Sequence, residues 1–96
     1  MAHYIALIHK EAGSGFGVSF PDVPGTITVG STIDQAMAEA VEVLRFAAED
    51  WQSLTGRAFP NPRTIDELRD DPEFLEAAAD AIVAAVPFKS TVDAAA

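Results

Sequence analysis

The chain has 96 residues, 15 acidic against 6 basic side chains, and a formal charge of −9. This length predicts one domain with a single modest core. The sequence contains no cysteine, which excludes disulfides, thiolate metal sites and cysteine nucleophiles and favours a cytoplasmic location. No apolar run reaches the roughly 18 residues of a membrane-spanning helix, and the N-terminus lacks a signal-peptide pattern, so we expect no membrane partner.

The acidic balance bears on the class of partner. Binding to nucleic acid needs a basic face that neutralises phosphates, and this composition does not favour one. We therefore expect no direct nucleic-acid binding by this chain. The negative charge favours a basic protein partner, or it serves solubility alone, and composition leaves both interpretations open.

Two hydrophobic patterns near the N-terminus predict a hairpin. From His3 to His9 apolar side chains occupy both faces, which is typical of a strand inside a sheet. Phe16, Val18 and Phe20 alternate with small residues and predict a second strand with one apolar face. Glycines and polar residues between the two patterns predict the connecting turn.

The next segment, residues 20–32, is dense in turn-forming residues. Pro21 favours an extended Phe20, and Asp22 is suited to accept backbone N–H bonds in a turn. The dipeptide Pro24-Gly25 has the sequence of the middle of a type II turn. The β-branched run 26–29 predicts a third strand that continues the hairpin as an antiparallel meander.

Gly30 ends this strand, and the longest predicted helix follows, from Ile33 to Leu54. Thr32 and Gln35 have the spacing of a capping box, and Gly56 is placed to end the helix. One apolar stripe is expected to face the sheet: Ile33, Ala36, Met37, Ala40, Leu44, Ala47, Ala48 and Trp51. Phe46 lies outside that stripe, about 140° from its centre at about 100° per residue. A contact with a second copy or a partner and a simply exposed Phe46 are about equally favoured.

Two short helices and a fourth strand are expected after a proline-containing linker. Thr64 and Glu67 form a second capping box, and Asp71-Pro72 has the pattern of a helix start. The aliphatic run 81–86 then predicts the fourth strand. We therefore expect one domain over residues 1–88, a disordered tail over 89–96, and an α+β fold: a two-layer β-β-β-α-β sandwich with short extra helices before the last strand.

No constellation of residues predicts catalysis. His3 and His9 lie on one strand face but about 20 Å apart, too far to share a metal ion. The acidic group Asp66, Glu67, Asp70, Asp71 and Glu73 lacks the spacing of a calcium loop, and acids at helix N-termini need no ion to explain them. The serines have no histidine in a nucleophile arrangement. We expect no catalytic residue, no metal and no cofactor, and therefore not an enzyme.

Residues 20–32 resemble the signature of the HicB-like antitoxins. The resemblance runs from about Tyr4 to Leu54, and the motif that carries it is Phe20-Pro21-Asp22-Val23-Pro24-Gly25, followed by Thr28, Gly30, Thr32, Ala36 and Ala40. The motif residues expected to specify the fold are Phe20, Pro21, Asp22, Pro24, Gly25, Gly30 and Thr32. The resemblance implies a partial RNase-H-like fold without the nuclease's acidic cluster. It also implies an antitoxin that binds and occludes a small basic HicA-like mRNA endonuclease, and a homodimer or higher oligomer. Many such antitoxins carry a C-terminal DNA-binding module, and this sequence ends soon after the fourth strand.

The candidate partner-binding residues follow from the acidic charge, the motif and the exposed aromatic. They are Asp22, Phe46, Glu67, Asp70, Asp71 and Glu73. An acidic face would attract a basic toxin and accelerate association. The alternative hypothesis is an orphan HicB-like regulatory or structural dimerisation domain that has no toxin partner.

Overall fold

The structure is a computed structural model and describes residues 2–10, 13 and 15–89. Its elements follow the predicted order: β1 (Ala2–Lys10), β2 (Phe16–Ser19), β3 (Ile27–Gly30), α1 (Ile33–Thr55), α2 (Ile65–Arg69), α3 (Pro72–Ala78) and β4 (Ile82–Phe88). The predicted α+β class and element order are therefore confirmed, with ends that differ by one or two residues. The predicted tail falls, from residue 90 onward, outside the described residues. Among the helices in the described ranges, none is both long enough and apolar enough to cross a membrane.

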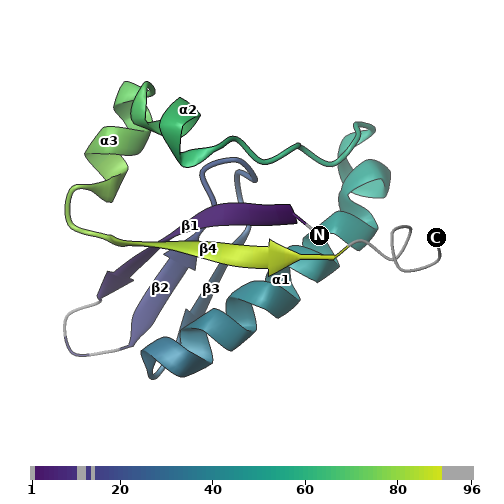
Figure 1. The fold of residues 1–96 in the computed structure, drawn as a ribbon. Helices are drawn as coiled ribbons and strands as arrows, with labels where there is room; N and C mark the ends of the chain where they lie inside the picture. The colour runs from purple at the N-terminus through teal and green to yellow at the C-terminus, as the bar shows by residue number, and fades with distance from the viewer. Residues whose placement is uncertain (1, 11–12, 14, 90–96) are drawn as a thin grey trace.

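The four strands form one antiparallel sheet in the order β3-β2-β1-β4 (Figure 1). The meander of β1, β2 and β3 is as predicted, with Ile8 opposite Val18 and Val18 opposite Thr28. β4 returns along the free side of β1, from Ala2 opposite Phe88 to Ile8 opposite Ile82. β1 is therefore an interior strand, which agrees with its apolar side chains on both faces.

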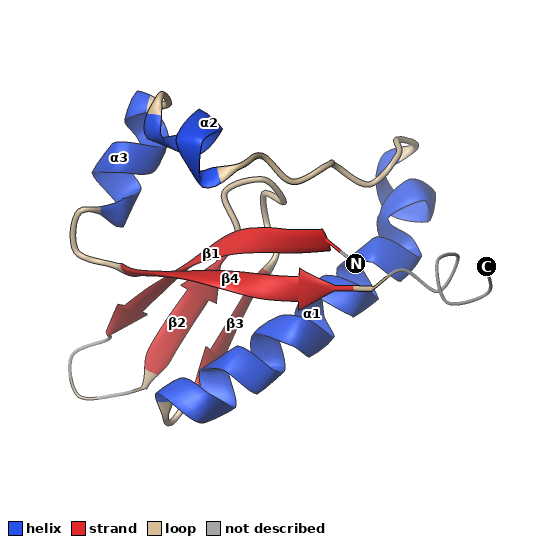
Figure 2. Ribbon diagram, in the orientation of Figure 1, coloured by secondary structure: helices blue, strands red, loops and turns tan. Residues whose placement is uncertain are grey.

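Helices lie on both faces of this sheet (Figure 2). On one face α1 buries Ala36, Ala40 and Leu44 completely against side chains of β1, β2 and β4. On the other face Leu68 of α2 and Phe74 of α3 are buried with Leu7 of β1. The sheet and α1 are the two predicted layers, and the short helices cover the part of the second face that lies over β1.

The motif between β2 and α1 has the local structure that its sequence predicts. The N–H of Thr26 donates to the carbonyl of Val23 over 3.1 Å, and Gly25 has a φ of +86°, which identifies the type II turn. Gly30 meets a different requirement, because a Cβ there would lie 2.4 Å from the backbone nitrogen of Ala36. Glycine at this position therefore lets α1 begin directly against β3.

The predicted helix caps are present. Thr32 accepts the N–H of Gln35 at 3.0 Å, while the Gln35 side chain accepts from Ser31 rather than from Thr32. Thr64 and Glu67 form a complete capping box, and Asp71 caps α3 ahead of Pro72.

The prediction that Ile33 belongs to the stripe facing the sheet was wrong. Ile33 is 43% exposed, because it starts the helix before α1 meets the sheet at Ala36.

Candidate functional site

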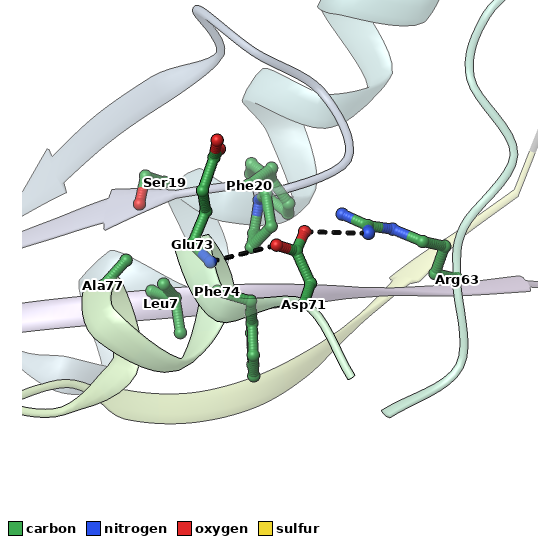
Figure 3. A pocket seen from close by; sticks show the side chains of 9 residues that line it. Leu7, Ser19, Phe20, Arg63, Asp71, Glu73, Phe74 and Ala77 are labelled. Carbon is green, nitrogen blue, oxygen red and sulfur yellow. Dashed lines mark hydrogen bonds and ion pairs between the residues drawn. The ribbon is translucent and has the colours of Figure 1, made fainter. Parts of the chain in front are cut away.

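A hollow of about 240 Å³ lies between the sheet and α3, beside the end of β2 (Figure 3). The sheet side of the hollow is formed by Leu7, Ser19, Phe20 and Pro21, and α3 contributes Phe74 and Ala77. Its polar rim consists of Arg63, Asp71 and Glu73. The hollow is therefore lined both by the motif of residues 20–32 and by the acidic segment around α3, two segments that are far apart in the sequence.

Arg63 makes that connection through two carboxylates. Asp22 accepts the backbone N–H of Arg63 at 2.7 Å and its Nε–H at 2.6 Å. The Nη1 of Arg63 donates to Asp71 at 3.0 Å. We call this arrangement of Asp22, Arg63 and Asp71 the Arg63 clamp. It fixes the chain just before α2 to the turn after β2, 41 residues away, and ties both to the first turn of α3.

The electrostatics of the Arg63 clamp follow from its hydrogen bonds. The side chain of Asp22 is only 6% exposed, that of Asp71 is 29% exposed and that of Arg63 is 38% exposed. The hydrogen bond to Asp22, followed by that to Asp71, raises the pKa of Arg63 above its usual value. The hydrogen bond from Arg63 lowers the pKa of Asp71, as does the backbone N–H of Glu73. Arg63 and Asp71 are therefore both charged at neutral pH.

A hydrogen bond and a cluster of aromatic rings hold the linker between α1 and α2 in place. The hydroxyl of Tyr4 on β1 donates to the carbonyl of Pro60. The Tyr4 ring contacts Phe59 and Phe88, and Trp51 of α1 meets Phe59 edge to face. Burial raises the pKa of Tyr4, and the charge of Asp22 raises it further. This aromatic cluster brings the linker along the sheet to the position where Arg63 reaches Asp22.

The structure places the six sequence-predicted contact residues in two regions. Four acids lie on or between α2 and α3, and the Arg63 clamp joins Asp22 to them. Phe46 lies on α1, in the layer on the opposite face of the sheet, and is 53% exposed. The guanidinium of Arg45 lies 4.8 Å from the centroid of its ring. Phe46 therefore does not join the acidic group.

The acids themselves differ in how their side chains are used. Asp22 and Asp71 belong to the Arg63 clamp, and Asp71 also accepts the N–H of Glu73 at 3.0 Å. Glu67 accepts the N–H of Thr64 at 2.8 Å in the capping box. The exposed side chains of Asp70 and Glu73 are not engaged in an ion pair with any described residue. Of the predicted contact acids, Asp70 and Glu73 are thus the two whose carboxylates bind no described residue.

Sequence reasoning missed Arg63, the residue that organises the site. The local signal was weak: a basic residue between Pro62 and the cap Thr64, in a linker with no apolar pattern. Its long-range partner Asp22 gave no local sign of the pairing either. The described residues contain no group of three or more His, Asp or Glu side chains placed to hold a metal ion. The arrangement presents carboxylates beside an apolar hollow, which suits contact with a basic protein surface.

Comparisons with known proteins identify the family. Residues 4–94 match the family model of the HicB-like antitoxin of bacterial toxin–antitoxin systems. The structure is similar to the N-terminal domain of the Burkholderia pseudomallei antitoxin HicB, with a TM-score of 0.71 and 31% identity over 91% of this chain and 98% of that one. It is also similar to a chain of a HicA3–HicB3 toxin–antitoxin complex, with a TM-score of 0.70 and 26% identity over 91% of this chain and 98% of the other.

Two further relatives are longer than this chain. An uncharacterised 14.9 kDa protein of Haemophilus phage HP1 is 31% identical over 67 residues, which cover 70% of this chain and 50% of that protein. A longer structure of the B. pseudomallei antitoxin HicB is 63% covered, with a TM-score of 0.69 and 31% identity over 91% of this chain. This chain thus spans about half to two thirds of their lengths. On its family match and on the fold that it shares with these structures, the chain belongs to the HicB-like antitoxins of bacterial toxin–antitoxin systems.

Proposed function

We propose that this chain is the toxin-binding domain of an antitoxin, and that it binds and occludes a small basic HicA-like mRNA endonuclease in the cytoplasm. The observation that carries the proposal is its likeness, over 91% of its length, to a chain of a solved HicA3–HicB3 complex. The role is a binding one, in which this chain contributes no catalytic group.

Charge supports this class of partner. The chain has a formal charge of −9, and α2, α3 and the junction between them carry a dense set of acids: Asp66, Glu67, Asp70, Asp71, Glu73 and Glu76. A field of this sign accelerates encounter with a basic protein and weakens as salt is added, because the Debye length falls to about 8 Å at physiological ionic strength. We therefore place the first contact with the toxin at these helices.

Within that group we assign direct contacts to Asp70 and Glu73, the two of the predicted contact residues in this region whose carboxylates are exposed and bound to no described residue. Asp22, Glu67 and Asp71 contribute indirectly, since their carboxylates already hold Arg63 or cap a helix. Phe46 is proposed as a separate apolar contact on the α1 side. A toxin that met both regions would have to reach around one edge of the sheet.

The experiment is co-purification of this chain with the protein encoded beside it, followed by an RNA-cleavage assay of that protein alone and in the presence of this chain. Stoichiometric binding with loss of cleavage supports the proposal. A neighbour that cleaves RNA equally well with this chain present would refute it. A dimer with no toxin partner would favour the orphan regulatory or structural domain instead.

A pair of charge-reversal variants then tests the acidic contact. Asp70→Lys with Glu73→Lys should slow association at low salt by about tenfold or more, because electrostatic steering changes on-rates by 10 to 1000-fold. The matched control is Glu39→Lys with Asp50→Lys, which changes the net charge equally on exposed positions of α1. Equal slowing by both pairs would show that net charge alone, rather than the α2–α3 face, attracts the toxin.

A further inference from the structure

The two edges of the sheet differ in how they are protected against pairing with another strand. β4 carries Pro87, which has no N–H to donate, and continues into Lys89. β3, at the other edge, has the sequence Ile27-Thr28-Val29-Gly30 and contains neither a charge nor a proline. Charged residues and prolines are the usual devices that keep an edge strand from pairing. β3 is therefore the edge that is open to another strand.

The side chains of β3 also expose apolar surface at this edge. Ile27 and Val29 are 68% and 70% exposed, and they lie on the face opposite α1, where they pair with Ser19 and Gly17 of β2. Because these two neighbours are small, a hollow of about 230 Å³ runs beside the aliphatic side chains and reaches His9 of β1. Exposed aliphatic side chains next to a hollow mark a surface that another apolar group can fill.

Charge indicates which partner fits this edge. Among the residues that the structure describes, no acidic side chain lines the hollow, and β3 itself contains none. A basic toxin finds no complement here, whereas it finds one at α2 and α3. Two copies of a chain of charge −9 repel each other wherever acidic surfaces meet, and an acid-free edge lowers that repulsion. A second copy of this chain is therefore the occupant that the charges favour.

We propose that β3 pairs antiparallel with β3 of a second copy, about a two-fold axis at Thr28. In this register Ile27 of each copy lies opposite Val29 of the other, so four aliphatic side chains meet on one face. The two four-stranded sheets become one continuous sheet of eight strands. The α2–α3 regions stay outside the junction, so each copy keeps its acidic face free.

The first test measures the mass of the chain alone by light scattering during size-exclusion chromatography. The wild-type chain should be a dimer, and Val29→Lys should be a monomer that keeps its circular dichroism spectrum, because this side chain is largely exposed. Leu54→Lys, at an 82% exposed position on α1, is the matched control and should remain a dimer. A monomeric wild-type chain, or a dimer that Phe46→Ala abolishes and Val29→Lys does not, would overturn the proposal.

The absence of native cysteine allows a second test of the register. Directly opposite residues of an antiparallel pair have Cα atoms about 4.5 to 5.5 Å apart, within the range of about 4.4 to 6.8 Å that disulfides span. Thr28→Cys should therefore form a covalent dimer under mild oxidation, and Ala85→Cys on the β4 edge should not. A covalent dimer from Ala85→Cys alone would overturn the choice of edge. Both tests use only this chain, so their outcome is independent of toxin binding.

Discussion

The two faces of the sheet are covered in different ways. On one face a single helix of 23 residues buries Ala36, Ala40 and Leu44. On the other face two helices of 5 and 7 residues bury only Leu68 and Phe74, and the Arg63 clamp ties them to the rest. Helices this short are not stable alone, since isolated helices below about 12 to 15 residues are marginal even in favourable sequences. The face that carries the proposed acidic contacts with the toxin is therefore the one that depends on a few specific anchors.

Leu44→Ala tests the α1 face and should have the largest effect. Leu44 is completely buried between α1 and the sheet. Its truncation removes apolar contacts and leaves a cavity, so we expect a loss of about 3 to 4 kcal/mol in the free energy of unfolding. Urea denaturation measures this loss, with exposed Leu54→Ala as the control that should change little. Similar values for both variants would mean that α1 does not form the core with the sheet.

Leu68→Ala tests the opposite face and should have a smaller and more local effect. Leu68 is completely buried, but the layer it anchors is short. We expect a loss of about 2 kcal/mol, at the low end for a buried leucine, because this layer can open while the sheet and α1 remain folded. Amide hydrogen exchange should accelerate in α2 and α3 far more than in α1. Uniform acceleration across the chain would show that both faces unfold as one unit.

Asp22→Asn tests the Arg63 clamp, which holds α2 and α3 to the rest of the chain. The side chain of Asp22 is nearly buried and accepts two hydrogen bonds from Arg63, so loss of its charge should cost about 1 to 2 kcal/mol. The matched control is Glu42→Gln, which removes a carboxylate from the exposed ion pair with Arg45. Exposed pairs contribute about 0 to 1 kcal/mol, so this control should remain close to wild type in thermal denaturation. Equal losses would contradict a special role for the Arg63 clamp.

The α1 face was predictable from sequence because its determinants are local. The apolar stripe, the Thr32 cap and Gly56 specify the helix within a few residues of each position, and Gly30 and Pro24-Gly25 specify the turns before it. Ile33 was the exception, since periodicity cannot show where along its length a helix first meets the sheet. The exposure of Phe46 was predicted correctly, because helical angle alone places it away from the stripe.

The α2–α3 face was predictable only in part. Its caps at Thr64 and Asp71 are local, and both were predicted. The pairing of Asp22 with Arg63 is not, since 41 residues separate them and a charged residue gives no periodic signal. For the same reason the sequence identified a dense acidic group without showing which carboxylates are already engaged. The edge position of β3 was also missed, because the β-branched run that predicts a strand is the same at an edge and in the interior.

The smallest expected effect is on the pH dependence of stability, through the ion pair of Asp71 with Arg63. The pKa of Asp71 is lowered in the folded state by Arg63, so its contribution to stability is fully present above the unfolded value of about 3.9. That contribution is lost as the pH falls through the lowered folded-state pKa. Asp71→Asn keeps a residue suited to cap α3 and should be slightly less stable at pH 7, with a shallower decline in melting temperature below about pH 4. Arg63→Gln should flatten the same acid limb. An acid limb as steep in both variants as in the wild-type chain would mean that other carboxylates, and not this pair, control the stability of the α2–α3 face in acid.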